Sequence, residues 1–153
     1  MRFSVLLPVL LLALAGCGKD GTAPSGDPLV GSWEADPRCL WDCWFTIRSI
    51  TNPADSLNLT DQASARFELD LRSNGSYQMV LSAPPNLNNQ DDGTYTSTAG
   101  LLILSGADGV DTVDYHLASP LLRLSFRRHL ALVDLSGDGV PDTVTVEASL
   151  KKF

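Results

Sequence analysis

The sequence has few basic residues and lacks the common catalytic motifs. Lysine and arginine together number 11 in 153 residues, against 18 aspartates and glutamates, and the net charge is −7. Because phosphate recognition depends on clustered lysine and arginine, this balance argues against a nucleic-acid partner or an anionic lipid surface. A G-x-S-x-G elbow, a phosphate-binding loop and an H-E-x-x-H motif are all missing, and the chain has two histidines. We therefore expect a binding protein and not an enzyme.

Long apolar runs are also missing, apart from one at residues 3–14 that is too short to span a bilayer. It follows the basic start Met1-Arg2 and ends in Leu14-Ala15-Gly16-Cys17, which resembles the signal of bacterial lipoproteins. The resemblance implies that residues 1–16 are a signal peptide. It also implies that Cys17 becomes the first mature residue and carries thioether-linked diacylglycerol, often with an amide-linked chain such as palmitate. The alternatives are an ordinary secretory signal or a buried segment with an incidental cysteine.

The next segment, residues 17–28, is rich in small and polar residues and has no apolar anchor, which predicts a flexible tether. Gly18 stands where the inner-membrane retention pattern of enteric bacteria has aspartate. We therefore expect the outer membrane, with the domain facing the periplasm or the cell surface. Residues 29–153 are enough for one domain and too few for two. Removing residues 1–16 takes away Arg2 as the only charge and moves the net charge from −7 to −8.

The chain has three cysteines, and lipidation of Cys17 leaves the pair Cys39 and Cys43. Because export brings the pair into an oxidising compartment, we expect a disulfide that closes a small loop. A metal site at this C-x3-C motif is the alternative. His116 and His129 are the other candidate ligands, and neither belongs to a cluster with ligand spacing.

Alternation of apolar and polar residues predicts strands, most clearly at residues 65–82, where Asn74-Gly75 supplies the tight turn of a hairpin. The other expected strands are residues 29–35, 44–50, 56–60, 93–98, 101–104, 110–117, 121–126, 129–135 and 143–150. Residues 83–92, rich in proline and asparagine, predict a long loop with Asp91-Asp92 as a turn. No ten-residue stretch predicts an amphipathic helix.

Eight to ten short strands at hairpin spacing predict an all-β domain, either an antiparallel up-and-down barrel or a β-sandwich. Three stretches carry a further likeness: Gly31-Ser32-Trp33, the hairpin at residues 72–77, and Asp91 to Tyr95 followed by the apolar residues 101–104. These stretches resemble the small bacterial lipocalin-like lipoproteins, and the resemblance covers roughly residues 29–150.

The resemblance implies a lipocalin-like barrel in which a basic side chain, Lys151 or Arg127, packs over Trp33. The alternative is that Trp33 is a core aromatic residue of another β-fold. A barrel of about eight strands is filled by side chains or keeps a small apolar cavity at its mouth. We therefore expect a lipid-anchored binding module for a small hydrophobic or amphipathic ligand. The residues expected to line the cavity or the core are Trp33, Phe67, Tyr77, Met79 and Tyr95.

A protein partner is the second functional hypothesis. Some bacterial inhibitors of proteases and lysozymes are small barrels with an N-terminal disulfide loop, which the segment from Cys39 to Cys43 resembles. The neighbouring Trp41 and Trp44 suit a contact surface for a periplasmic hydrolase if they are exposed.

Residues 134–142 form a candidate calcium loop, with oxygen-bearing groups at positions 1, 3, 5, 7 and 9 and glycine at position 6. The pattern resembles the calcium-binding hairpin loops of β-propeller repeats. The expected ligands are Asp134, Ser136, Asp138, the backbone carbonyl of Val140, and Asp142. The alternative is a plain hairpin turn with solvated carboxylates, because residues 105–113 nearly repeat residues 136–144 without the first aspartate. A calcium-stabilised structural lipoprotein is the third functional hypothesis.

Overall fold

The computed structural model describes residues 26–35, 39, 42–52, 54, 56–58, 64–84, 87–107, 109–127, 130–140 and 142–153. These residues form an all-β fold without a helix. The strands are β1 (Gly31–Ala35), β2 (Trp44–Ser49), β3 (Ser56–Asn58), β4 (Arg66–Leu71), β5 (Ser76–Ala83), β6 (Leu87–Thr98), β7 (Leu101–Gly106), β8 (Gly109–Ala118), β9 (Leu121–Phe126), β10 (Leu130–Val133) and β11 (Asp142–Lys152).

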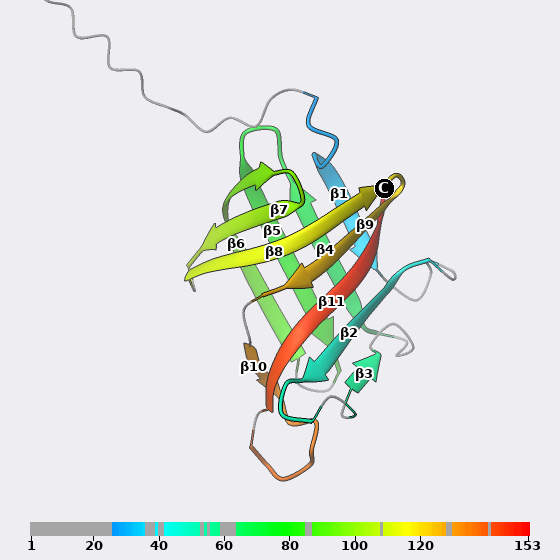
Figure 1. Cartoon of the computed structure of the whole chain (residues 1–153), viewed down its shortest axis with the longest axis vertical. Helices are drawn as coiled ribbons and strands as arrows, with labels where there is room; N and C mark the ends of the chain where they lie inside the picture. Colours follow the sequence, from blue (N-terminus) through cyan, green and yellow to red (C-terminus); the bar gives the residue numbers. More distant parts are fainter. Residues whose placement is uncertain are drawn as a thin grey trace, which may run out of the picture.

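Eight of these strands close into a barrel, which Figure 1 shows from the side. Antiparallel neighbours follow the order β1-β4-β5-β6-β7-β8-β9-β11, and β11 returns to β1 through the pairs Trp33↔Lys152 and Glu34↔Lys151. Outside this ring, β2 pairs with β11, β3 pairs with β2, and β10 pairs with β11. The prediction of a closed antiparallel barrel is therefore confirmed over the β-sandwich. The architecture fits a lipocalin-like fold.

Alternate residues of the strands point inward and fill the barrel, as the sequence pattern predicted. The ring of Phe67 lies near the middle of this core, at 6.0 Å from the ring of Phe45 and 6.1 Å from the ring of Phe126. The largest side chains with no exposure beyond 2% are Trp33, Tyr77, Phe45, Phe67, Leu29, Ile47, Leu69, Leu71, Leu102, Leu104 and Leu122. Aromatic and branched side chains from opposite walls thus meet across the barrel.

The expected hairpin between β4 and β5 is present. Gly75 has a φ of +80° and donates its N–H to the carbonyl of Arg72 at 3.0 Å. The side chain of Asn74 accepts the N–H of Ser76 at 3.0 Å, which holds the turn from the other side. Glycine is needed here because this backbone conformation is unfavourable for residues with a Cβ.

The expectation of a long loop at residues 83–92 is wrong. β6 begins at Leu87, and its first half pairs with β5 from Ala83↔Leu87 to Gln78↔Asp92. Asparagine and aspartate disfavour strands in isolation, but the backbone of the eight-residue β5 needs a hydrogen-bonded neighbour on this side. Pairing therefore overrides local propensity, and Asp91-Asp92 is part of a strand and not a turn.

Candidate functional site

The five residues predicted to line a cavity lie together in the packed interior. The exposed fractions are 1% for Trp33, Phe67 and Tyr77, 4% for Tyr95 and 7% for Met79. All five belong to the same buried cluster of apolar side chains. They therefore contribute to the core, and their role toward a ligand stays a prediction.

The side chain over Trp33 belongs to Lys152, and the expectation of Lys151 or Arg127 is wrong. Lys152 is directly opposite Trp33 in the pairing of β1 with β11, and its Nζ lies 5.1 Å from the centre of the indole ring. It also donates to the carbonyl of Pro28 at 3.0 Å. Lys151 is one residue away and points to the outer face, since side chains alternate along a strand. Lys152 thus covers Trp33 at the end of the barrel where the chain terminates.

A buried polar cluster connects β5, β6 and β8. The hydroxyl of Tyr77 on β5 donates to the carboxylate of Asp91 on β6, and the nearby Asp111 on β8 is 8% exposed. Gly106 on β7 leaves the space for this contact, because a Cβ there would lie 2.3–2.5 Å from the Asp91 carboxylate and the Tyr77 hydroxyl. Burial raises the pKa of Tyr77 well above its ordinary value, and the hydrogen bond to Asp91 raises it further.

We expect Tyr77 to make the protein sensitive to alkaline pH. The folded state holds this tyrosine neutral, whereas the unfolded chain releases the proton near its ordinary pKa of 10.0. The stabilisation is complete below that pH and is lost progressively as the pH rises above it. Melting temperatures between pH 8 and 11 should therefore fall more steeply for the wild type than for Tyr77→Phe, and equal slopes would contradict this assignment.

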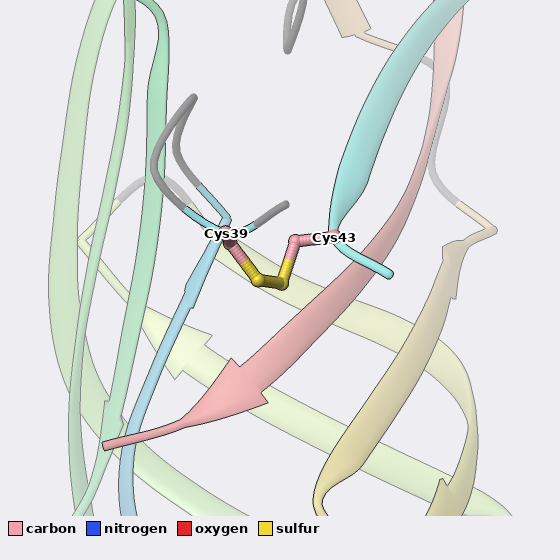
Figure 2. Close-up of a disulfide and its surroundings, with 2 residues drawn as sticks. All are labelled: Cys39 and Cys43. Atoms are coloured by element: carbon pink, nitrogen blue, oxygen red, sulfur yellow. A yellow bond between two sulfur atoms is a disulfide. The ribbon is translucent and has the colours of Figure 1, made fainter. Parts of the chain in front are cut away.

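The predicted disulfide between Cys39 and Cys43 is present, with a Cα–Cα distance of 5.5 Å. Figure 2 shows the bond joining the chain after β1 to the chain before β2, beside β11. Both strands are antiparallel to β11 and follow one another along it, with Glu34 opposite Lys151 and Trp44 opposite Ser149. The disulfide therefore closes the connection between two strands that pair with the same edge of β11. Both thiols of the alternative metal site are used in this bond.

Removing this disulfide should lower the free energy of unfolding by about 2 kcal/mol, because a closed loop of about five residues restricts the unfolded chain by that amount. The measurement is urea unfolding of the double variant Cys39→Ser, Cys43→Ser. Reduction of the wild type should produce the same loss and leave the double variant unchanged. A wild type whose free energy of unfolding does not change on reduction would contradict the expected stabilisation.

The loop between β10 and β11 contains the candidate calcium ligands. Asp134 accepts the N–H groups of Gly137 and Gly139 at 2.6 and 2.7 Å, and the amide of Gly139 is the main reason why its pKa lies below the ordinary value. Asp142 accepts the N–H groups of Leu135 and Ser136 at 2.6 and 3.0 Å. Asp138 accepts the N–H of Val140 at 2.8 Å. These carboxylates therefore stabilise the turn through backbone contacts.

Calcium binding by this loop stays a prediction. Among the described residues, no group of three or more histidine, cysteine or acidic side chains is arranged to hold a metal ion. The calcium hypothesis predicts a higher melting temperature in millimolar calcium than in chelator, and it predicts that Asp134→Ala abolishes the difference. Equal melting temperatures for the wild type in the two conditions would contradict it.

A groove of about 380 Å³ runs over the outside of β8, β9, β11 and β2, and we call it the outer groove. Its outward-pointing lining side chains are Trp44, Asp114, His116, Arg123, Ser125 and Glu147. The strand pairing arranges the outer face in two rows, each crossing four strands. One row is His116, Arg123, Ser149 and Trp44, and the other is Asp114, Ser125, Glu147 and Thr46.

The outer groove contains charges that lack an ion-pair partner among the described residues. Asp114 is paired with Arg127 through contacts of 2.7 and 2.5 Å, which lower the pKa of this carboxyl. Arg123 and Glu147 form no ion pair with any described residue. An exposed guanidinium and a half-buried carboxylate therefore remain available beside the half-buried Trp44.

Ser149 adds a buried hydroxyl to the same place. Its exposed fraction is 1%, and its Oγ has no hydrogen-bond partner among the described residues. The pairing places it on the outer face between Arg123 and Trp44. A buried hydroxyl without a partner costs about 1–3 kcal/mol, and this oxygen lies beneath the surface of the outer groove, not in its lining.

A second groove, of about 230 Å³, lies on the outside of β1, β4 and β5, and its acidic residues have partners. Asp70 contacts Arg72 at 3.6 Å and accepts a hydrogen bond from Ser32. Glu68 is paired with Arg66. Because each of these carboxylates has a basic partner, this surface is the weaker candidate for a binding site.

No protein-family model matches the chain, and no curated protein matches it in sequence. The part of the chain that the structure describes has no helix long and apolar enough to cross a membrane. The predicted lipidation residue Cys17, together with Trp41 and His129, lies outside the described residues.

Proposed function

We propose that this protein is a lipid-anchored binding module of a bacterial cell envelope. The support for the anchor is the motif ending in Cys17, followed by the polar tether up to residue 28. Asp27 accepts a hydrogen bond from the backbone of Leu29 at 2.9 Å and another from Ser97 at 3.1 Å, so contacts with the barrel begin near the expected end of the tether. In this proposal, the acyl chains on Cys17 hold the domain at the outer membrane.

Membrane fractionation of the cells that make the protein tests the anchor. The wild type should partition into detergent and carry acyl chains on Cys17 by mass spectrometry, whereas Cys17→Ser should lose both properties. The double variant Cys39→Ser, Cys43→Ser is the matched control and should stay in the membrane. A wild-type protein with an unmodified Cys17 in the soluble fraction would overturn the anchor.

The recognition site of this module is the outer groove, and its ligand is small and amphipathic. The observation that carries this conclusion is the half-buried Trp44 beside Arg123 and Glu147, two charges without an ion-pair partner among the described residues. Binding sites combine apolar surface with a few polar groups that fix the orientation of the ligand. The outer groove has this composition, whereas the residues first expected to line a cavity are part of the core.

A photoreactive amino acid introduced at Ser125, which lines the outer groove, tests this site in living cells. The matched control carries the same group at Gln78, which lines the second groove on the outside of β1, β4 and β5. We expect a covalent adduct at position 125 and none at position 78. Adducts at both positions, or at neither, would overturn the outer groove as the recognition site.

A protein-binding module, such as an inhibitor of a periplasmic hydrolase, is the second candidate. It is favoured by the position of Trp44, which directly follows the disulfide-bonded Cys43 and lines the outer groove. Aromatic residues at such positions often dominate the energy of protein interfaces. The mass of the adduct at position 125 separates the two candidates, because a protein partner adds many kilodaltons and a small ligand adds a few hundred daltons.

A further inference from the structure

The two charges in the outer groove that lack an ion-pair partner have opposite signs and lie close together. Arg123 is directly opposite Ser149, and Glu147 is directly opposite Ser125, so Arg123 and Glu147 are diagonal neighbours on β9 and β11. Diagonal neighbours on antiparallel strands have their backbones about 7–8 Å apart, and long side chains reach across this distance. Both charges can therefore contact a single small molecule.

Neither a simple anion nor a simple cation fits this arrangement. An anion that pairs with Arg123 is repelled by Glu147, and a cation that pairs with Glu147 is repelled by Arg123. The nearby Asp114 does not change this balance, because Arg127 compensates its charge through two contacts. His116, which lies beside Arg123 in the same row, adds no negative charge. A molecule that carries both an ammonium and a carboxylate is attracted by both partners.

Trp44 indicates the rest of the ligand. It is half-buried, lines the outer groove and lies in the same row as Arg123, with Ser149 between them. Its indole ring therefore offers an aromatic face to an apolar group.

We propose that the outer groove binds a free α-amino acid with an apolar side chain. Its carboxylate contacts Arg123, its ammonium contacts Glu147, and its side chain packs on Trp44. This assignment rests on the proposed function, because it names the ligand class of that same groove.

Three probes test the assignment by isothermal titration with the full mature chain. L-Phenylalanine carries both charges, N-acetyl-L-phenylalanine lacks the ammonium, and L-phenylalaninamide lacks the carboxylate. We expect L-phenylalanine to bind at least tenfold more tightly than either analogue. Equal affinities for the three probes would overturn the assignment.

Two variants make the test specific for the two charges. In Glu147→Gln, the acetylated probe should bind at least as tightly as L-phenylalanine, because the ammonium loses its partner and the repulsion of the anion disappears. In Arg123→Gln, the amide probe should become the preferred ligand, because the carboxylate loses its partner and the repulsion of the cation disappears. Arg72→Gln, outside the outer groove, is the control and should keep the wild-type order of affinities. Unchanged orders in the first two variants would also overturn the assignment.

Failure of the amino-acid assignment can be told apart from failure of the proposed function. If no probe binds but the photoreactive group at position 125 still forms an adduct, the amino-acid assignment is overturned and the outer groove stands as the recognition site. If the adduct is also missing, both are overturned.

Discussion

Replacing Phe67 with alanine should lower the free energy of unfolding by about 3–5 kcal/mol, which is the usual cost of removing a buried aromatic side chain. Phe67 is 1% exposed and contacts the rings of Phe45 and Phe126, which come from β2 and β9. The variant therefore leaves a cavity where three parts of the barrel meet. Urea unfolding followed by tryptophan fluorescence measures the change.

Phe153→Ala is the matched control for this prediction. Phe153 is 68% exposed, so its removal should change the free energy of unfolding by less than about 0.5 kcal/mol. A loss at position 67 as small as that at position 153 would show that the interior is not packed as described.

Replacing Gly93 with alanine should destabilise the protein by about 3 kcal/mol, at the upper end of the range for overpacking. Gly93 lies on β6 between Tyr77 of β5 and Gly106 of β7. A Cβ at this position would be 2.0 Å from the backbone carbonyl oxygen of Ser105. Because that oxygen belongs to the paired strand, the clash cannot be relieved by a side-chain rotation, and β6 and β7 must separate.

Thr94→Ala is the control for the glycine substitution, since Thr94 is the next residue of β6 and its side chain is exposed. It should change the free energy of unfolding by less than about 1 kcal/mol. Thermal unfolding of both variants measures the difference. Wild-type stability in Gly93→Ala would mean that β6 and β7 are not paired in this register.

The strands with clean alternation could be predicted from the sequence, and the polar half of β6 could not. In β4 and β5, apolar residues mark one face because that face is buried against the core. Residues 87–92 are almost entirely polar, and Asp91 points inward because it contacts Tyr77. That contact becomes visible only when β5 and β6 are paired, so local composition favoured a loop.

A shift of one residue along β11 decides which lysine packs over Trp33. The sequence indicated a basic side chain near the C terminus, but Lys151 and Lys152 point to opposite faces of β11. Only the pairing with β1 decides which of them faces Trp33. The disulfide was more predictable, because Cys39 and Cys43 are the pair that remains once Cys17 is assigned to the lipid anchor, and export would place them in an oxidising compartment.

The outer groove could not be predicted from the sequence, because its residues come from four strands, and β2 is distant along the chain from β8, β9 and β11. Trp44 was singled out as a contact residue, and His116 belongs to the strand that was expected at residues 110–117. Arg123, Glu147 and Ser149 carried no signal, since each follows ordinary strand alternation. They meet only because β11 lies between β9 and β2 in the sheet.

Nuclear magnetic resonance of the indole N–H groups tests most directly whether the ligand binds outside the barrel. Trp33 donates its indole N–H to the carbonyl of Leu29 at 2.7 Å in the interior, whereas Trp44 lines the outer groove. The labelled mature chain is titrated with L-phenylalanine and with a small-molecule extract of the cell envelope. We expect the signal of Trp44 to shift while that of Trp33 stays in place. A shift of Trp33 with an unchanged Trp44 would contradict it and place the ligand inside the barrel.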